Sequence, residues 1–171
     1  SCGVSSWLRV DDNAIPARSK ITGSYVNAAL AKTEAQEAGY DEAIVLTNDG
    51  HVSEGSAENL FMVRNGRLVT PPVSDNILEG IVRQSIIRIA GDLAIPLDER
   101  SIDRTELYIA DELFLCGTGA QLAPVTSVDH RTVGGGLVGP ITQKLSRIYF
   151  DAVHGIGDRY TEWVTPVYPA R

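Results

Sequence analysis

Residues 43–70 read AIVLTNDGHVSEGSAENLFMVRNGRLVT, and this stretch decides the fold class. Short apolar segments alternate in it with turn signals, which are Asn-Asp-Gly at 48–50 and Asn-Gly at 65–66. The expected strands are residues 43–47, 51–53, 60–64 and 67–70. Because short turns join them, the stretch predicts a meander of antiparallel strands.

Helical periodicity marks three other parts of the chain. The expected helices are residues 23–38, residues 80–93 and a third helix that Gly139-Pro140 opens. Thr22 is expected to cap the first helix, whose apolar face contains Val26, Leu30 and Ala31. Further strands are expected at 4–10, 98–101, 112–116, 124–128 and 131–133, with a helical turn at 104–108 and an irregular tail at 163–171. These elements predict an α+β fold in one domain.

Composition restricts the class of protein. The 171 residues are 43% hydrophobic and 22% charged, which is typical of a globular domain. A net charge of -7 argues against a nucleic-acid partner, because such surfaces gather Lys and Arg. No apolar run approaches the roughly 20 residues of a membrane span, so no membrane partner is expected. Cys2 and Cys116 lack metal-ligand spacing and favour a reducing cytoplasm over a disulfide framework.

Two groups of residues have the chemistry of a catalytic site. An enclosed lysine such as Lys20 can form a Schiff base with a carbonyl, and the Tyr25 phenol can hydrogen-bond an oxygen beside it. Because Lys20 precedes a helix N-terminus, its pKa should fall in dry surroundings. Glu54, in a turn closed by Gly55, can hold a cation. Taken alone, such a lysine is more often a surface residue, such a tyrosine a core residue and such a glutamate a solvated turn residue.

A third group consists of two glycine-bounded turns. Gly80-Ile81-Val82 opens a helix, and Gly117-Thr118-Gly119-Ala120 ends a strand. Backbone N–H groups at both places can cradle a phosphate or carboxylate, although such turns commonly only redirect the chain. Together, an imine-forming lysine, an acid for a ring nitrogen and an anion site are what pyridoxal 5'-phosphate requires.

Nearly the whole chain resembles the branched-chain aminotransferases of the class IV, fold type IV group. The similar stretches are residues 20–46 (KITGSYVNAALAKTEAQEAGYDEAIVL), 52–72 (VSEGSAENLFMVRNGRLVTPP), 77–95 (ILEGIVRQSIIRIAGDLAI), 106–134 and 139–153. They occur in the same order as in that family. The resemblance implies a pseudo-barrel of antiparallel strands with flanking helices, and pyridoxal 5'-phosphate as the cofactor.

The resemblance also implies a role for each candidate residue. Lys20 would form the Schiff base and move the substrate's α-proton, Tyr25 would hydrogen-bond the ring oxygen, and Glu54 would keep the pyridine nitrogen protonated. The other cofactor-binding residues would be Leu78 on the ring, Ile81 and Val82 through backbone N–H groups, and Thr118 through its hydroxyl. Gly119 and Ala120 would donate N–H groups near the substrate carboxylate.

The chain departs from the family pattern in three ways. Residues 80–83 read GIVR where GITR is usual, so a hydroxyl contact to the phosphate is absent. Residues 117–121 read GTGAQ where GTAAE is frequent, which loosens the loop and removes a carboxylate. Family members also have a small N-terminal domain that supplies a phosphate-binding arginine, and nothing before Ser1 corresponds to it. Residues 1–171 are therefore interpreted as the large cofactor-binding domain alone.

The implied activity of the complete protein is transamination between a branched-chain L-amino acid and 2-oxoglutarate, in branched-chain amino acid biosynthesis. A D-amino-acid transaminase, an aminodeoxychorismate lyase and a non-catalytic cofactor-binding module are alternatives. By analogy a homodimer or larger homo-oligomer is expected.

Some polar residues receive purely structural interpretations. Arg83 and Arg88 are expected on the polar face of the second helix, and Cys116 in a buried strand. Glu58 and Asn59 are expected to brace the Glu54 turn. The three histidines, His51, His130 and His154, are expected near the surface rather than as metal ligands.

Overall fold

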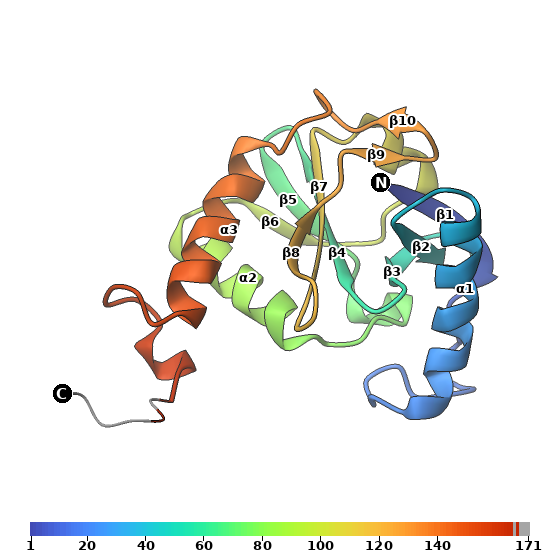
Figure 1. Ribbon diagram of the computed structural model, residues 1–171, viewed down its shortest axis with the longest axis horizontal. Coiled ribbons are helices and arrows are strands. Elements are labelled where there is room, and N and C mark those ends of the chain that lie inside the picture. Colours follow the sequence, from blue (N-terminus) through green and yellow to red (C-terminus); the bar gives the residue numbers. More distant parts are fainter. Residues whose placement is uncertain (166, 168–171) are drawn as a thin grey trace.

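The computed structural model describes residues 1–165 and 167, and its strands form two five-stranded sheets (Figure 1). The first sheet, in spatial order, contains β10 (Arg131–Thr132), β9 (Ser127–Val128), β1 (Cys2–Leu8), β2 (Glu42–Leu46) and β3 (Val52–Gly55). The second contains β6 (Leu97–Glu99), β5 (Arg67–Thr70), β4 (Asn59–Arg64), β7 (Glu112–Gly117) and β8 (Gln121–Pro124). Together with the helices, these sheets confirm the α+β class.

The strands of residues 43–70 form two hairpins in different sheets. β2 pairs antiparallel with β3, and β4 pairs antiparallel with β5. Asn65 and Gly66 have φ values of 51° and 72°, the left-handed conformation that a two-residue hairpin turn needs. Between β3 and β4 the chain leaves one sheet for the other, so the expected single meander is divided at this point. Glu54 lies beside this crossing.

Helical connections produce parallel pairs within both sheets. β1 is parallel to β2, and β5 is parallel to β6. A helix lies between the two strands of each pair in the sequence, as a parallel crossover requires. The antiparallel pattern therefore holds at the hairpins but not across these connections.

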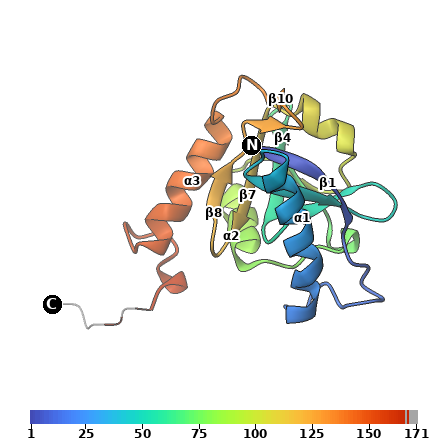
Figure 2. The same cartoon turned by 45° about the vertical axis from the view of Figure 1, so that its right-hand side comes forward.

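Three α-helices cover the sheets from opposite sides. They are α1 (Tyr25–Glu37), α2 (Ile81–Asp92) and α3 (Pro140–Val153), and the 3-10 turns are η1 (Thr22–Ser24), η2 (Val73–Asp75), η3 (Arg104–Ile109) and η4 (Thr161–Trp163). α1 packs on β1 and β2, whereas α2 and α3 pack on each other and on β7 (Figures 1 and 2). Among the described residues, no helix is both long and apolar enough to span a membrane.

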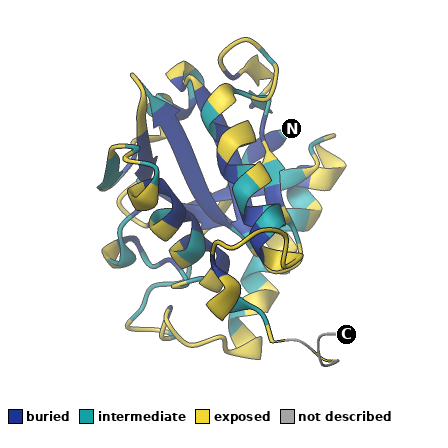
Figure 3. Cartoon of the chain, turned by 90° about the vertical axis from the view of Figure 1, so that its left-hand side faces the viewer, coloured by how far each residue is buried: buried dark blue, intermediate teal, exposed yellow. Residues whose placement is uncertain are grey.

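Apolar side chains fill two main layers. Leu60 and Met62 of β4 join a cluster between the sheets. Phe61 and Val63 point to the other face of β4 and join the cluster beneath α2 and α3, where Phe61 stacks on Phe114 with ring centroids 5.1 Å apart. β4 is therefore buried on both faces, while the outer surfaces of the two helices are exposed (Figure 3).

The first helix differs from expectation in its cap and its buried face. Thr22 lies in η1, and neither η1 nor α1 has a side-chain cap hydrogen bond. The buried residues of α1 are Ala31 and Ala35, whereas Val26 is 67% exposed and Leu30 is 42% exposed. Small alanine side chains allow the helix to lie close to β1 and β2, so the larger apolar residues face outward. The predicted Thr22 cap is therefore wrong, and of the predicted buried face only Ala31 is confirmed, since Val26 and Leu30 face outward.

Some boundaries also differ. β1 begins at Cys2 and ends at Leu8, two residues earlier at each end than the predicted strand. Gly3 is needed inside it, because a Cβ there would lie 2.4 Å from the Tyr40 ring. In the predicted irregular tail, Trp163 belongs to η4 and stacks on Tyr160 at 4.3 Å between ring centroids. The rest of that prediction falls partly on residues 166 and 168–171, outside the described part of the chain.

Candidate active site

A cleft of about 210 Å³ opens where the chain crosses between the two sheets. Its walls come from the segment before α1, the β3–β4 turn, the start of α2 and the end of β7. Seven of the nine sequence-predicted site residues line it: Lys20, Tyr25, Glu54, Leu78, Ile81, Val82 and Thr118. Gly119 and Ala120 follow Thr118 in the β7–β8 turn but are not among the lining residues. The fold thus brings together residues almost 100 positions apart.

The carboxylate of Glu54 is buried in the cleft and held from three sides. Only 5% of the residue is exposed. Oε1 lies 2.9 Å from Nη2 of Arg9, and Oε2 accepts hydrogen bonds from the Leu78 N–H and from Nδ2 of Asn59, both at 3.0 Å. Glu54 is therefore not the solvated turn residue that its sequence context commonly indicates.

Burial controls the protonation of Glu54. Loss of solvation raises the pKa of this carboxyl to about 7, although the Arg9 guanidinium and the Leu78 N–H both pull it downward. A cation placed against the carboxylate would favour the ionised form further. The site is therefore suited to a positively charged partner at neutral pH.

Arg9 is a site residue that the sequence did not indicate. Its side chain is 11% exposed, and Nε donates to the Asn76 carbonyl at 2.8 Å. The Arg9 N–H donates to the carbonyl of Leu46 in β2, which also pairs with β3, and this arrangement brings Arg9 to Glu54. Only the strand order of the sheet could reveal the contact, since 45 positions separate the two residues.

Lys20 and Tyr25 line the cleft near the surface. Lys20 is exposed and Tyr25 is 36% exposed. η1 separates Lys20 from the start of α1, so the lysine does not directly precede that helix. The residues that the structure describes therefore do not enclose Lys20.

The start of α2 provides the candidate anion site. Gly80 is the N-cap and no side chain caps the helix, so the first-turn N–H groups have no capping side-chain acceptor in the described structure. A Cβ on Gly80 would lie 2.2 Å from Oδ1 of Asn59, so only glycine fits here without a shift. Gly80, Ile81 and Val82 all line the cleft. These amides face the same space as Thr118 and can bind an anion.

The predicted brace around Glu54 is confirmed. Asn59 donates to Glu54 and also to the Leu78 carbonyl at 2.8 Å, so it holds both walls of the cleft. The Glu58 carbonyl accepts the Gly55 N–H at 2.7 Å, which closes the turn. Cys116 is fully buried at the cleft floor, where burial raises the pKa of its thiol to about 12. It is therefore an uncharged filler, as expected.

Arg83 contradicts its predicted place on an exposed helix face. The residue is 1% exposed, and Nη2 donates to the Pro71 carbonyl at 3.0 Å and to Oε2 of Glu99 at 2.6 Å. It turns inward because the third residue of α2 faces the end of β5 and β6. Arg88 does lie on the polar face, with its side chain 58% exposed and near Asp92.

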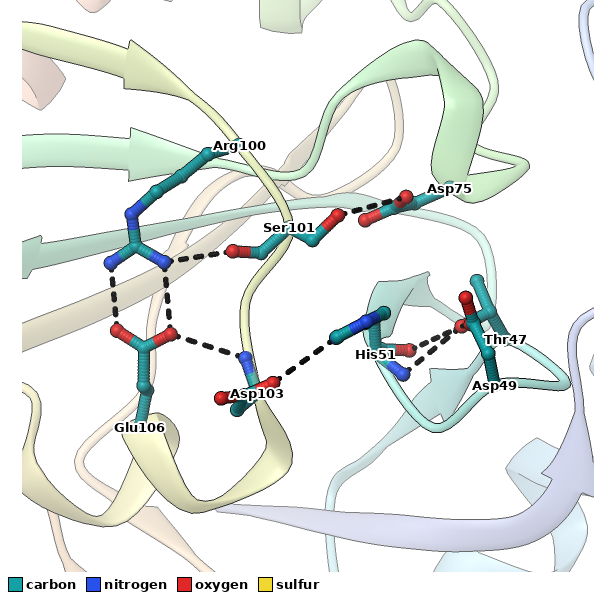
Figure 4. Close-up of polar contacts among 8 residues, drawn as sticks. All are labelled: Thr47, Asp49, His51, Asp75, Arg100, Ser101, Asp103 and Glu106. Carbon is teal, nitrogen blue, oxygen red and sulfur yellow. Dashed lines mark hydrogen bonds and ion pairs between the residues drawn. The ribbon is translucent and has the colours of Figure 1, made fainter.

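His51 opens the stretch HVSEG but takes no part in the cleft. Figure 4 shows it in a polar network, where its Nδ1 lies 3.1 Å from Oδ1 of Asp103 and its backbone exchanges hydrogen bonds with the Thr47 hydroxyl. In the same network Ser101 donates to Asp75, the last residue of η2. These contacts hold the β2–β3 turn against the segments that follow β5 and β6. His130 and His154 are exposed, as expected.

Comparison with known proteins gives the family. A model of the family described as "Amino-transferase class IV" matches residues 1–128. This chain belongs to the class IV aminotransferases. A probable branched-chain-amino-acid aminotransferase of Aquifex aeolicus (strain VF5) is 53% identical over 166 residues, which are 96% of this chain and 53% of that protein. The chain therefore spans about half the length of the curated relatives it matches.

Solved structures of class IV relatives have the same fold. A branched-chain aminotransferase from Thermoproteus uzoniensis, crystallised with norvaline, is 50% identical with a TM-score of 0.94, and the match covers 98% of this chain and 55% of that one. A branched-chain amino acid aminotransferase from Thermobaculum terrenum, crystallised in its PLP-form (holo-form), is 43% identical with a TM-score of 0.95. That match covers 98% of this chain and 55% of the Thermobaculum chain. Residues 1–128, which the family model matches, contain every residue that lines the cleft.

Proposed function

We propose that this chain forms the cofactor-binding part of a pyridoxal 5'-phosphate-dependent aminotransferase that moves an amino group between a branched-chain L-amino acid and 2-oxoglutarate. The observation that carries the proposal is the buried Glu54 carboxylate, fixed by Arg9, in the same cleft as Lys20 and the α2 N-terminus. A phosphorylated pyridine aldehyde needs an acid, an amine and an anion site. The cleft offers a candidate for each of these three needs.

The residues of the cleft fit the cofactor at both ends. The Glu54 carboxylate is already oriented by three neighbours and is suited to a protonated ring nitrogen. At the other end, the uncapped N–H groups of Ile81 and Val82, with the Thr118 hydroxyl, are donors for a phosphate. Leu78 donates its N–H to Glu54, precedes Gly80 by two residues and would pack on the ring. When bound, pyridoxal 5'-phosphate supplies an electron sink for the substrate's α-carbon.

The protein groups would act by holding and moving protons. Glu54 would keep a proton on the ring nitrogen, because an ion pair with a cation favours its carboxylate. Arg9 fixes Oε1 and opposes the burial penalty on that charge. The Nζ of Lys20 would accept the α-proton of the amino acid and return it to a neighbouring carbon. Tyr25 would donate a hydrogen bond to the ring oxygen, and Gly119 and Ala120 would donate N–H groups to the substrate carboxylate.

The remainder of the site would come from outside these residues. We infer that a second, smaller domain closes the cleft over Lys20, since this side is exposed and the relatives are about twice as long. A homodimer and a cytoplasmic location remain predictions; the free, buried Cys2 and Cys116 are compatible with a reducing compartment.

Two alternative activities belong to other members of the same fold. A D-amino-acid transaminase and an aminodeoxychorismate lyase would use the same lysine and acid, so the cleft geometry does not separate them. The names of the relatives favour branched-chain substrates. A non-catalytic cofactor-binding module is favoured by one observation, the exposure of Lys20 in the described structure.

A test on the full-length protein separates these activities. Added pyridoxal 5'-phosphate should give a protein-bound absorbance band, and borohydride should fix the cofactor to Lys20, which peptide mass spectrometry would locate. Lys20→Ala should lose the band and the turnover of L-leucine, while Lys144→Ala, an exposed lysine on α3, should keep both. Retention of both by Lys20→Ala contradicts the proposal, and turnover of only D-alanine or aminodeoxychorismate selects an alternative.

A further inference from the structure

Arg83 is among the largest side chains that the fold buries completely. It is the third residue of α2, one position beyond the cleft-lining Val82. A buried guanidinium is costly because five N–H donors and a full charge leave water. Its burial one residue beyond the candidate anion site requires an explanation.

The charge of Arg83 is only partly compensated. Its carboxylate partner is Glu99, whose side chain is 44% exposed and therefore partly solvated. Its other acceptor is the neutral Pro71 carbonyl. The buried Nε has no hydrogen-bond partner among the residues that the structure describes. A net positive potential therefore remains at the base of α2.

This potential extends into the cleft. The Arg83 guanidinium lowers the pKa of the Glu54 carboxyl and of the Cys116 thiol, although burial raises both pKa values overall. Glu54 and Cys116 line the cleft, whereas Arg83 does not. The charge thus acts through the packed interior, where electrostatic interactions are weakly screened. The first-turn amides of α2 point their own positive ends into the same space.

We propose that Arg83 is a positioning residue for the phosphate end of the ligand: a buried cation that strengthens anion binding at the Ile81 and Val82 amides without touching the anion. The inference rests on the proposed function, since it assumes a phosphate at the α2 N-terminus. It also accounts for Val82, which offers the anion a backbone N–H but no side-chain hydroxyl. An anion at the Ile81 and Val82 amides would complete the compensation of the Arg83 charge, which Glu99 only partly provides.

A purely structural role is the competing explanation. Arg83 fixes the start of α2 to Pro71 and Glu99, so its loss could disturb the whole segment that carries Leu78 and Gly80. A structural role affects every ligand of the cleft, with or without a phosphate. An electrostatic role affects the phosphate selectively, and the two explanations therefore make different predictions.

The test compares pyridoxal 5'-phosphate with pyridoxal, which lacks the phosphate, in the full-length protein. Dissociation constants would be measured from ligand absorbance, and the ³¹P resonance of the bound cofactor would report its phosphate environment. Arg83→Met should weaken the binding of pyridoxal 5'-phosphate by about tenfold or more and shift the ³¹P resonance of the bound cofactor. The same variant should change the dissociation constant of pyridoxal by less than about twofold. Arg83→Lys should restore most of the affinity. The control Arg88→Met removes an exposed charge from the same helix and should change neither constant.

Glu99→Gln provides a second variant in case Arg83→Met does not fold. It removes the compensating charge but leaves the buried cation and an amide oxygen for its hydrogen bond. The electrostatic role predicts equal or tighter binding of pyridoxal 5'-phosphate, whereas a structural role predicts weaker binding of both ligands. The proposal is overturned if either variant loses the same affinity for both ligands, or if Arg83→Met loses no affinity for pyridoxal 5'-phosphate. Failure of the unsubstituted protein to bind pyridoxal 5'-phosphate instead overturns the proposed function.

Discussion

Nη2 of Arg9 lies 2.9 Å from Oε1 of Glu54, and both side chains are almost completely buried. The pair joins the residue that follows β1 to the β3 strand, through the β2 strand between them. Because Arg9 also donates to the Asn76 carbonyl, it connects the carboxylate to the loop that carries Leu78. One guanidinium therefore opposes the burial penalty on the Glu54 charge and fixes Oε1, while Leu78 and Asn59 hold Oε2.

Arg9→Met should destabilise the cofactor-free protein. Removing one partner of a buried pair leaves the other charge uncompensated, which costs about 3 kcal/mol of unfolding free energy. The Glu54 pKa should also rise further, since Arg9 lowers it in the unsubstituted protein. Urea unfolding at pH 7 measures the loss. Arg18→Met is the control, because the Arg18 side chain is 56% exposed and its removal should cost no more than about 1 kcal/mol. Equal losses of unfolding free energy in the two variants would contradict the role of Arg9 as the charge partner of the buried Glu54.

Glu54 should make stability depend on pH. Burial raises its pKa from the ordinary 4.5 to about 7, so between these values the folded protein binds a proton that the unfolded chain has released. Its contribution to stability is therefore fully present below pH 4.5 and is lost as the pH rises to about 7. The expected loss is about 3 kcal/mol.

Urea unfolding of the cofactor-free protein across this pH range measures that loss. Glu54→Gln removes the titrating group and should flatten the decline, whereas Glu37→Gln, an exposed glutamate of α1, should retain it. The same slope in Glu54→Gln as in the unsubstituted protein would show that another group titrates.

Local patterns predict the hairpins, and the family resemblance names most of the residues that line the cleft, whereas contacts such as those of Arg9 and Arg83 have no signal in the sequence. Asn65-Gly66 encodes its turn through left-handed φ values, and this information is local. The exit from the first sheet after Gly55 carries no local signal, and the sequence pattern therefore predicts one meander where the structure has two hairpins in different sheets. Arg83 and Arg9 have ordinary charged sequence contexts, and only the packing of α2 and the order of the strands bury them.

The two cysteines should not react in the folded protein. Cys2 is 1% exposed and Cys116 is 0% exposed, and burial raises the pKa of each thiol to about 12. The thiolate is the reactive form, so iodoacetamide at pH 8 should label neither residue in the native state and both in urea. Peptide mass spectrometry distinguishes the two positions. Rapid native labelling of Cys116 would mean that the cleft floor opens.

Two glycines of the α2 segment should respond to alanine with opposite signs. At Gly80 a Cβ would lie 2.2 Å from Oδ1 of Asn59, the side chain that braces Glu54 and Leu78. Gly80→Ala should therefore displace Asn59, cost about 2 kcal/mol and weaken binding of pyridoxal 5'-phosphate. At Gly91, inside α2, a Cβ would meet nothing within 4 Å.

Gly91→Ala should instead stabilise the protein by about 0.5–1 kcal/mol, because alanine loses less backbone entropy in a helix. It should leave ligand affinity unchanged, since Gly91 does not line the cleft. Thermal unfolding and absorbance titration of both variants measure the two effects. If Gly80→Ala binds the cofactor normally, Asn59 can move without loss of the Glu54 contacts, and the brace is then not required for the site.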